Sequence, residues 1–170
     1  GVDSYVAHTR FLPLGLRLTN ILFHRILHRV SPSDVISNRE VIEHGLLSDS
    51  CISVGGDNYC YAPPYWLYAI DRALNRAKKP LILWGCSIEP SKITPDMLAD
   101  LRLFDLITCR ESITYEALMN AGITANTHLF PDPAFTLEGE NVDLPEGFIE
   151  HDTVGINVSP LVMKLENGES

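Results

Sequence analysis

The sequence lacks a long apolar run and lacks closely paired cysteines. Although 45% of its 170 residues are hydrophobic, no apolar run reaches the roughly 18 residues that span a bilayer, and the first residues show no signal-peptide pattern. The four cysteines form no CxxC pair, and histidines do not follow them at zinc-finger spacing. These absences argue against a membrane-spanning protein and a structural metal, and they favour a cytoplasmic protein with reduced thiols.

Positive charge is scarce beyond residue 40. The net charge is −9, because residues 1–40 hold five arginines and three acids, whereas the rest holds eight bases and nineteen acids. Nucleic-acid binding requires a clustered positive field, so we expect no nucleic-acid partner for the main body. The length suits one domain with a core of its own.

The basic stretch at about residues 11–30 predicts an amphipathic helix. Basic residues lie on a stripe next to its apolar residues. The apolar residues are spaced by four: Leu14, Leu18, Leu22 and Ile26. We interpret the helix as packing against the acidic remainder of the domain. The alternative is a weak contact of this helix with an anionic membrane surface, which would place the protein at the inner face of the membrane.

From residue 50 onward, short apolar runs alternate with helical patterns. Strands are predicted at 51–55, 80–84, 106–109 and 127–130, and helices at 64–78, 94–104 and 111–121, after an earlier helix at 38–47 with Ser37 as its N-cap. This alternation predicts parallel βαβ units with right-handed crossovers. We therefore expect an α/β fold with a Rossmann-like, doubly wound parallel sheet over residues 1–150. Residues 151–170 would be a linker and the start of a second domain.

Polar residues follow each predicted strand. Gly55, Gly56, Asp57 and Asn58 follow the first, Gly85 and Ser87 the second, Arg110 and Glu111 the third, and Asp132 the fourth. The carboxyl ends of parallel strands share one edge, so these side chains should face a common cleft.

Among the residues at this edge, Arg110 gives the most specific indication of a ligand. It follows a buried strand and precedes a helix N-terminus, and both features favour an anionic ligand. Structural alternatives stay open. The segment from Gly55 to Asn58 could be an ordinary turn, Arg110 could form an ion pair with Glu111 or Asp132, and Asp132 could hold its own loop through backbone N–H groups.

Five short segments carry a further pattern. They are Gly-Gly-Asp-Asn-Tyr at 55–59, Leu-Trp-Gly-Cys-Ser-Ile-Glu-Pro at 83–90, Ile-Thr-Cys-Arg-Glu-Ser at 107–112, Pro-Asp-Pro-Ala-Phe at 131–135 and Val-Gly-Ile-Asn-Val-Ser-Pro at 154–160. In this order they resemble the polysaccharide pyruvyl transferase family. The resemblance implies the N-terminal half of a GT-B-like enzyme with two Rossmann-like domains. Such an enzyme transfers pyruvate from phosphoenolpyruvate as a ketal onto a sugar of a cell-surface or exopolysaccharide glycan, with no other cofactor.

The resemblance also implies roles for the residues at the strand ends. Arg110 would bind phosphoenolpyruvate, and Asp57 would contact the acceptor hydroxyls and serve as a base, which makes these two the expected catalytic residues. The expected substrate-binding residues are Gly55, Gly56, Asn58, Tyr59, Gly85, Ser87, Glu111 and Asp132. The proton donor is expected in the second domain, through a histidine. Because the family's first strand is not seen here, we expect this chain to be a fragment without transferase activity of its own.

Two other functions fit the same sequence. One is a GT-B glycosyltransferase that uses a nucleotide sugar, and the other is a non-catalytic Rossmann-like module that binds a glycan or a partner. In the non-catalytic module, the Asp57 and Arg110 side chains would point away from each other into structural contacts. The distance between these two side chains therefore helps to distinguish a non-catalytic module from an enzyme.

Overall fold

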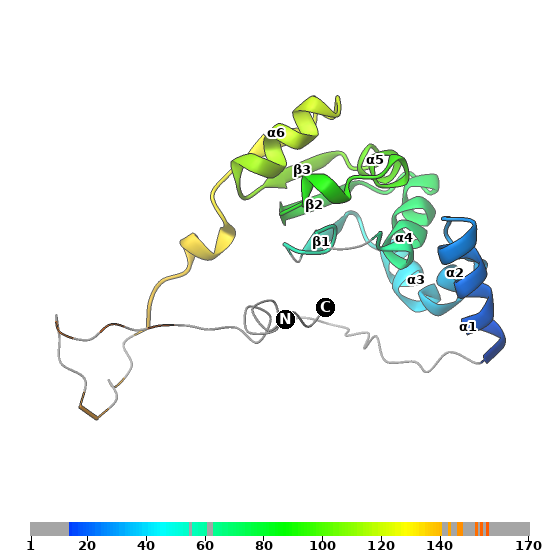
Figure 1. Cartoon of the computed structure of the whole chain (residues 1–170), viewed down its shortest axis with the longest axis horizontal. Coiled ribbons are helices and arrows are strands. Elements are labelled where there is room, and N and C mark those ends of the chain that lie inside the picture. Colours follow the sequence, from blue (N-terminus) through cyan, green and yellow to red (C-terminus); the bar gives the residue numbers. More distant parts are fainter. Residues whose placement is uncertain are drawn as a thin grey trace. The chain divides into compact units, whose positions relative to one another are not determined.

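The computed structural model describes residues 14–54, 56–60 and 63–140, together with 143, 146–147, 152, 154 and 156. The chain divides into two units, Gly1–Leu137 and Glu138–Ser170. All of the described helices and strands lie in the first unit (Figure 1). Most of residues 151–170, expected to be a linker and the start of a second domain, falls outside the described residues.

The described sheet has four parallel strands. They are β1 (Cys51–Val54), β2 (Leu81–Cys86), β3 (Leu106–Cys109) and β4 (Thr127–Leu129), hydrogen-bonded in the order β1-β2-β3-β4. The predicted α/β class with a Rossmann-like parallel sheet is therefore confirmed. Within the described residues the strand order runs in one direction, so β1 and β3 flank β2 and all four carboxyl ends reach one edge.

Three helices connect the strands. They are α4 (Tyr65–Arg76), α5 (Pro95–Leu101) and α6 (Ser112–Asn120). The start of α5 follows from its sequence, because the Thr94 hydroxyl accepts a hydrogen bond from the backbone N–H of Met97 at 3.2 Å and Pro95 occupies the first turn. Gly122, with φ of +75°, follows the end of α6, as helix C-termini commonly require.

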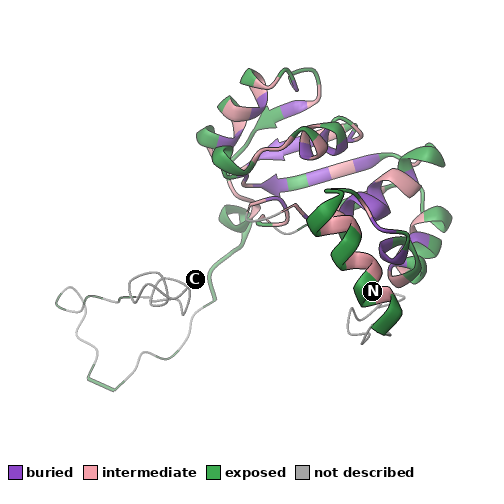
Figure 2. Cartoon of the chain, turned by 45° about the vertical axis from the view of Figure 1, so that its right-hand side comes forward, coloured by how far each residue is buried: buried purple, intermediate pink, exposed green. Residues whose placement is uncertain are grey.

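One face of the sheet carries the core. Leu81, Leu83 and Ile107 are fully buried, whereas the alternate positions Val54 and Trp84 are exposed. Figure 2 shows the buried residues gathered on the strands and on the helix faces packed against them. In β2 this alternation indicates that one face of the strand packs in the core, and α4 and α6 are among the helices that contact the sheet.

The N-terminal helices differ from the prediction. The single helix expected at 11–30 is α1 (Leu14–Ile21) followed by a π-helical turn, η1 (Leu22–Ile26). Then come α2 (Pro32–Ser37) and α3 (Arg39–Leu47), which pack against α4. Short 3-10 turns occur at η2 (Pro90–Lys92) and η3 (Pro133–Thr136).

The prediction that Ser37 caps the helix at 38–47 was wrong. Ser37 is the last residue of α2, and Asn38 precedes α3. The missed helix α2 begins with a capping box: the Ser31 hydroxyl accepts from the N–H of Ser33, and the Asp34 carboxylate accepts from the N–H of Ser31 at 2.7 Å. Pro32 therefore starts a helix as its first residue and does not simply end the preceding one.

Candidate functional site at the carboxyl edge of the sheet

The guanidinium of Arg110 lies at the centre of a polar cluster at the carboxyl edge. Its Nη2 donates to Asp57 Oδ1 at 2.7 Å, its Nη1 to Asp132 Oδ2 at 3.3 Å, and its Nε to the Ser87 hydroxyl at 2.7 Å. These residues follow four different strands. The structure thus brings together Asp57, Ser87, Arg110 and Asp132, as the sequence predicts. We call these four residues the Arg110 cluster.

Backbone hydrogen bonds hold the loops of the cluster in place. The N–H of Ser87 donates to the carbonyl of Gly56 at 2.7 Å, and the N–H of Arg110 donates to the carbonyl of Cys86 at 3.2 Å. Between them, the pairing of β2 with β3 shifts by a bulge, and Gly85 adopts φ of +63°, a left-handed conformation that glycine accepts without strain. The bulge brings the end of β2 level with the end of β3.

The guanidinium of Arg110 lies directly against the backbone of Gly56. A Cβ added at Gly56 would overlap the Nη1, Cζ and Nη2 atoms of Arg110. In its observed position the guanidinium therefore occupies the space that a side chain at residue 56 would need. This is a steric role for Gly56, in addition to any contact with a ligand.

A cavity of about 310 Å³ opens beside the cluster. It is lined by Val54, Gly56, Trp84, Gly85, Arg110, Asp132 and Pro133. The lining thus combines one cation, one carboxylate and an indole ring. A small anion with a short apolar part suits such a lining, because the guanidinium binds carboxylate or phosphate groups and the ring contacts the carbon atoms.

Three predicted site residues have structural roles. Glu111 is the N-cap of α6, where its carboxylate accepts from the N–H of Thr114 at 3.0 Å. The amide of Asn58 donates to the Ser53 hydroxyl at 3.1 Å and the Val54 carbonyl at 3.3 Å, which closes the turn after β1. Asp132 bonds to Arg110 and also accepts a hydrogen bond from the N–H of Ala134 at 2.9 Å. It therefore both pairs with Arg110 and holds its own loop.

Tyr59 was predicted to bind substrate, but its side chain is buried and does not reach the site. The side chain has no exposed surface, and its hydroxyl lies 3.0 Å from Asp71 Oδ2 and 2.8 Å from Asp100 Oδ2. Tyr59 therefore belongs to the core beneath the sheet edge. Gly55, another predicted binding residue, lies outside the described residues.

Asp71 and Asp100 form a buried carboxylate pair that was not predicted from the sequence. Burial, and then the neighbouring charge of Asp100, raise the pKa of Asp71 to about 8; burial raises that of Asp100 to about 6. The Tyr59 hydroxyl carries one proton and cannot donate to both acids at once, so a proton retained on Asp71 completes the network. Arg72 lies near Asp100, with Nε 3.7 Å from Oδ1. The available signal was the position of both acids among the inward residues of α4 and α5.

The residues of the Arg110 cluster lie within a region that matches a known protein family. The family model described as polysaccharide pyruvyl transferase matches residues 3–164. The chain belongs to the polysaccharide pyruvyl transferase family. Membership indicates a transferase in general terms. Searches of curated proteins and of solved structures returned no match.

The polysaccharide pyruvyl transferase match covers all four strands and the whole Arg110 cluster. Among the described residues, no group of three or more histidine, cysteine, aspartate or glutamate side chains is arranged to hold a metal ion. All four cysteines carry free thiols. Within the same part of the chain, no helix has the length and apolar character to cross a membrane.

Proposed function

We propose that this polysaccharide pyruvyl transferase uses the Arg110 cluster to bind phosphoenolpyruvate. Its pyruvate would be transferred as a ketal onto a sugar of a cell-surface or exopolysaccharide glycan. The observation that carries the proposal is a guanidinium that is held at the carboxyl edge of a parallel sheet and lines a cavity. Free thiols on all four cysteines suit work in the reducing cytoplasm.

The ion pairs of Arg110 are compatible with an exchange for a ligand. The Asp57 side chain is 54% exposed and that of Arg110 is 30% exposed, and a pair in such surroundings contributes only about 0–1 kcal/mol. A carboxylate or phosphate of the ligand can therefore replace Asp57 at the guanidinium at low cost. The hydrogen bonds from Arg110 to Ser87, Asp132 and Asp57 also use only three of the five N–H donors of its guanidinium.

The displaced Asp57 then has a role in the chemistry. A proton donor adds a proton to the methylene carbon of phosphoenolpyruvate, and positive charge develops at the adjacent carbon. One sugar hydroxyl attacks that carbon and loses its proton to a base, for which Asp57 is our candidate. The second hydroxyl attacks the same carbon as the C–O bond between that carbon and the phosphate breaks, and its proton passes to the departing phosphate, which yields the ketal and free phosphate. Arg110 stabilises the anionic groups throughout.

The geometry also bears on the non-catalytic alternative. A binding module would have Asp57 and Arg110 pointing apart, but the two side chains meet at 2.7 Å. This contact favours a shared site over two separate structural roles.

A ligand panel tests the proposed function. The protein is titrated with phosphoenolpyruvate, with a nucleotide sugar and with inorganic phosphate, and the binding heat is recorded. We expect saturable binding of phosphoenolpyruvate that is at least tenfold tighter than that of phosphate, because its carboxylate adds a second anionic group. Preferential binding of the nucleotide sugar would support the glycosyltransferase instead. Absence of binding by all three would support a module without a donor site.

A further inference from the structure

The helical segment of α1 and η1 presents its apolar residues to solvent. Leu14 is 71% exposed, Leu18 58% and Ile26 66%, and no residue of either element is buried. The helix does contact the domain, as predicted, but its apolar residues face solvent and are not the contacting side. We call the exposed set the α1 stripe: Leu14, Leu18, Ile21, Leu22 and Ile26.

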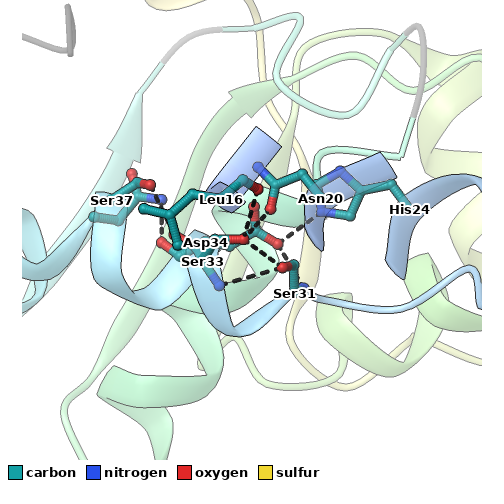
Figure 3. A network of polar contacts seen from close by, with 8 residues as sticks. Leu16, Asn20, His24, Ser31, Ser33, Asp34 and Ser37 are labelled. Atoms are coloured by element: carbon teal, nitrogen blue, oxygen red, sulfur yellow. Dashed lines mark hydrogen bonds and ion pairs between the residues drawn. The ribbon is translucent and has the colours of Figure 1, made fainter. Parts of the chain in front are cut away.

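The opposite, polar side of the helix is the one attached to the domain. His24 Nε2 lies 2.7 Å from Asp34 Oδ2, and the Asn20 side-chain oxygen accepts a hydrogen bond from the Ser33 hydroxyl. Figure 3 shows these side chains converging between α1 and α2. The His24 ring also stacks on Tyr65 of α4, with centroids 4.6 Å apart.

This attachment fixes which side of the helix faces outward. Asp34 is 3% exposed and also accepts from the N–H of Ser31 at 2.7 Å, so its carboxylate is a buried, fixed anchor. Rotating the helix to bury the stripe would break the contact between His24 and Asp34. The buried carboxylate of Asp34 would then lack one of its hydrogen-bond partners. The outward apolar face is thus a consequence of the polar anchor.

Positive charge surrounds the α1 stripe. Arg17 and Arg25 are exposed on this segment and Arg29 is exposed just after it, and the sequence has no acidic residue between Asp3 and Asp34. The rest of the chain is strongly acidic. An exposed apolar row flanked by arginines complements a surface that is apolar below and anionic at its boundary.

We propose that the α1 stripe docks the protein onto an anionic phospholipid bilayer. The leucine and isoleucine side chains enter the acyl boundary, and the arginines contact lipid phosphates. Binding is peripheral and reversible, since a short segment with few apolar residues gives only a modest partition coefficient. The proposal does not depend on catalysis, so it can be tested separately from the ligand site.

Vesicle sedimentation of the full chain provides the test. We expect the protein to sediment with vesicles of phosphatidylcholine and phosphatidylglycerol and to stay in solution with phosphatidylcholine alone. Added salt should weaken the binding, because screening shortens the reach of the arginines. Failure of the unmodified protein to bind the anionic vesicles would overturn the proposal.

Two pairs of variants separate the apolar and charged contributions. Leu18→Gln with Ile26→Gln should weaken binding by about tenfold or more, because apolar burial is lost; the matched control is Leu47→Gln with Ile113→Gln, whose side chains are 86% and 63% exposed on other helices. Arg17→Gln with Arg25→Gln should weaken binding to anionic vesicles by about tenfold. Its control is Arg76→Gln with Arg102→Gln.

Two further outcomes would also overturn the proposal. One is an equal loss of binding in the control variants, which would mean that the stripe has no special role. The other is a dimer that Leu18→Gln with Ile26→Gln abolishes, without any binding to vesicles. A second copy of the chain would then be what covers the stripe. Ultracentrifugation of each variant distinguishes these cases.

Discussion

A single arginine organises the candidate site, and a glycine makes its position possible. Arg110 gathers Asp57, Ser87 and Asp132 from loops that are far apart in the sequence. The contacts depend on the absence of a side chain at Gly56, over which the guanidinium lies. The observed position of the guanidinium therefore depends on a residue that contributes no functional group of its own.

Gly56→Ala should impair ligand binding more than stability. The new Cβ displaces the guanidinium, and because an arginine end can move aside, we expect a loss of only about 1 kcal/mol in the free energy of unfolding. Phosphoenolpyruvate binding should weaken by about tenfold or more, since the guanidinium loses its preorganised position. Titration calorimetry and chemical denaturation measure the two effects.

Gly139→Ala is the matched control, because nothing lies within 4 Å of a Cβ added there. Combining Gly56→Ala with Arg110→Ala gives a second check. Removing the arginine removes the clash, so the double variant should be more stable than the sum of the two single changes predicts. Strict additivity would contradict the steric role of Gly56.

At the scale of elements, one buried carboxylate joins α1 to the rest of the first unit. Asp34 contacts His24 of η1 and the backbone of Ser31 at the start of α2. Its side chain therefore both caps one helix and fixes the orientation of another.

Asp34→Ala should release α1 without unfolding the sheet. Loss of the carboxylate leaves the buried N–H of Ser31 without its partner and should cost about 2 kcal/mol. Hydrogen exchange should speed up in α1, η1 and α2, while β2 and β3 keep their protection. Asp49→Ala, at an exposed position, should change neither. Unchanged exchange in α1 after Asp34→Ala would contradict the anchor.

The sequence predicts elements best where the signals are local. The strand at 106–109 matches β3, and Thr94 with Pro95 marks the start of α5. The convergence of Asp57 and Arg110 was also predictable, because parallel strands place their carboxyl ends at one edge.

What the sequence did not predict depends on tertiary contacts. Tyr59 follows a run of glycine and polar residues typical of a loop, and its partners Asp71 and Asp100 come from two different helices, α4 and α5. The orientation of α1 is set by the buried Asp34, whereas periodicity alone favours burial of the apolar stripe. In both cases a buried polar partner outweighs the local pattern.

At the scale of the whole molecule, the buried acid pair should give the free energy of unfolding a particular pH dependence. The pKa values of Asp71 and Asp100 are raised from an ordinary value of 3.8 to about 8 and about 6. Between about pH 4 and pH 8 the folded protein therefore binds more protons than the unfolded chain, so these two groups make the free energy of unfolding fall as the pH rises. Their stabilising contribution is complete only below about pH 4.

Asp71→Asn tests this dependence. The amide keeps the shape of the protonated acid but cannot ionise, so the fall in the free energy of unfolding between pH 5 and pH 8 should shrink by about 1 kcal/mol or more. Urea denaturation at several pH values measures it. A slope identical to that of the unmodified protein would show that Asp71 is already ionised throughout this range.

The role that we propose for the Arg110 cluster is to bind phosphoenolpyruvate in this polysaccharide pyruvyl transferase. The most direct measurement is the Kd for phosphoenolpyruvate of the unmodified protein, of Arg110→Ala and of the control Arg102→Ala, by titration calorimetry at constant ionic strength. Our account predicts saturable binding that Arg110→Ala weakens by about a hundredfold, given roughly 3 kcal/mol for a lost charge-assisted contact, and that Arg102→Ala leaves unchanged. Equal affinity of the unmodified protein and Arg110→Ala would contradict it.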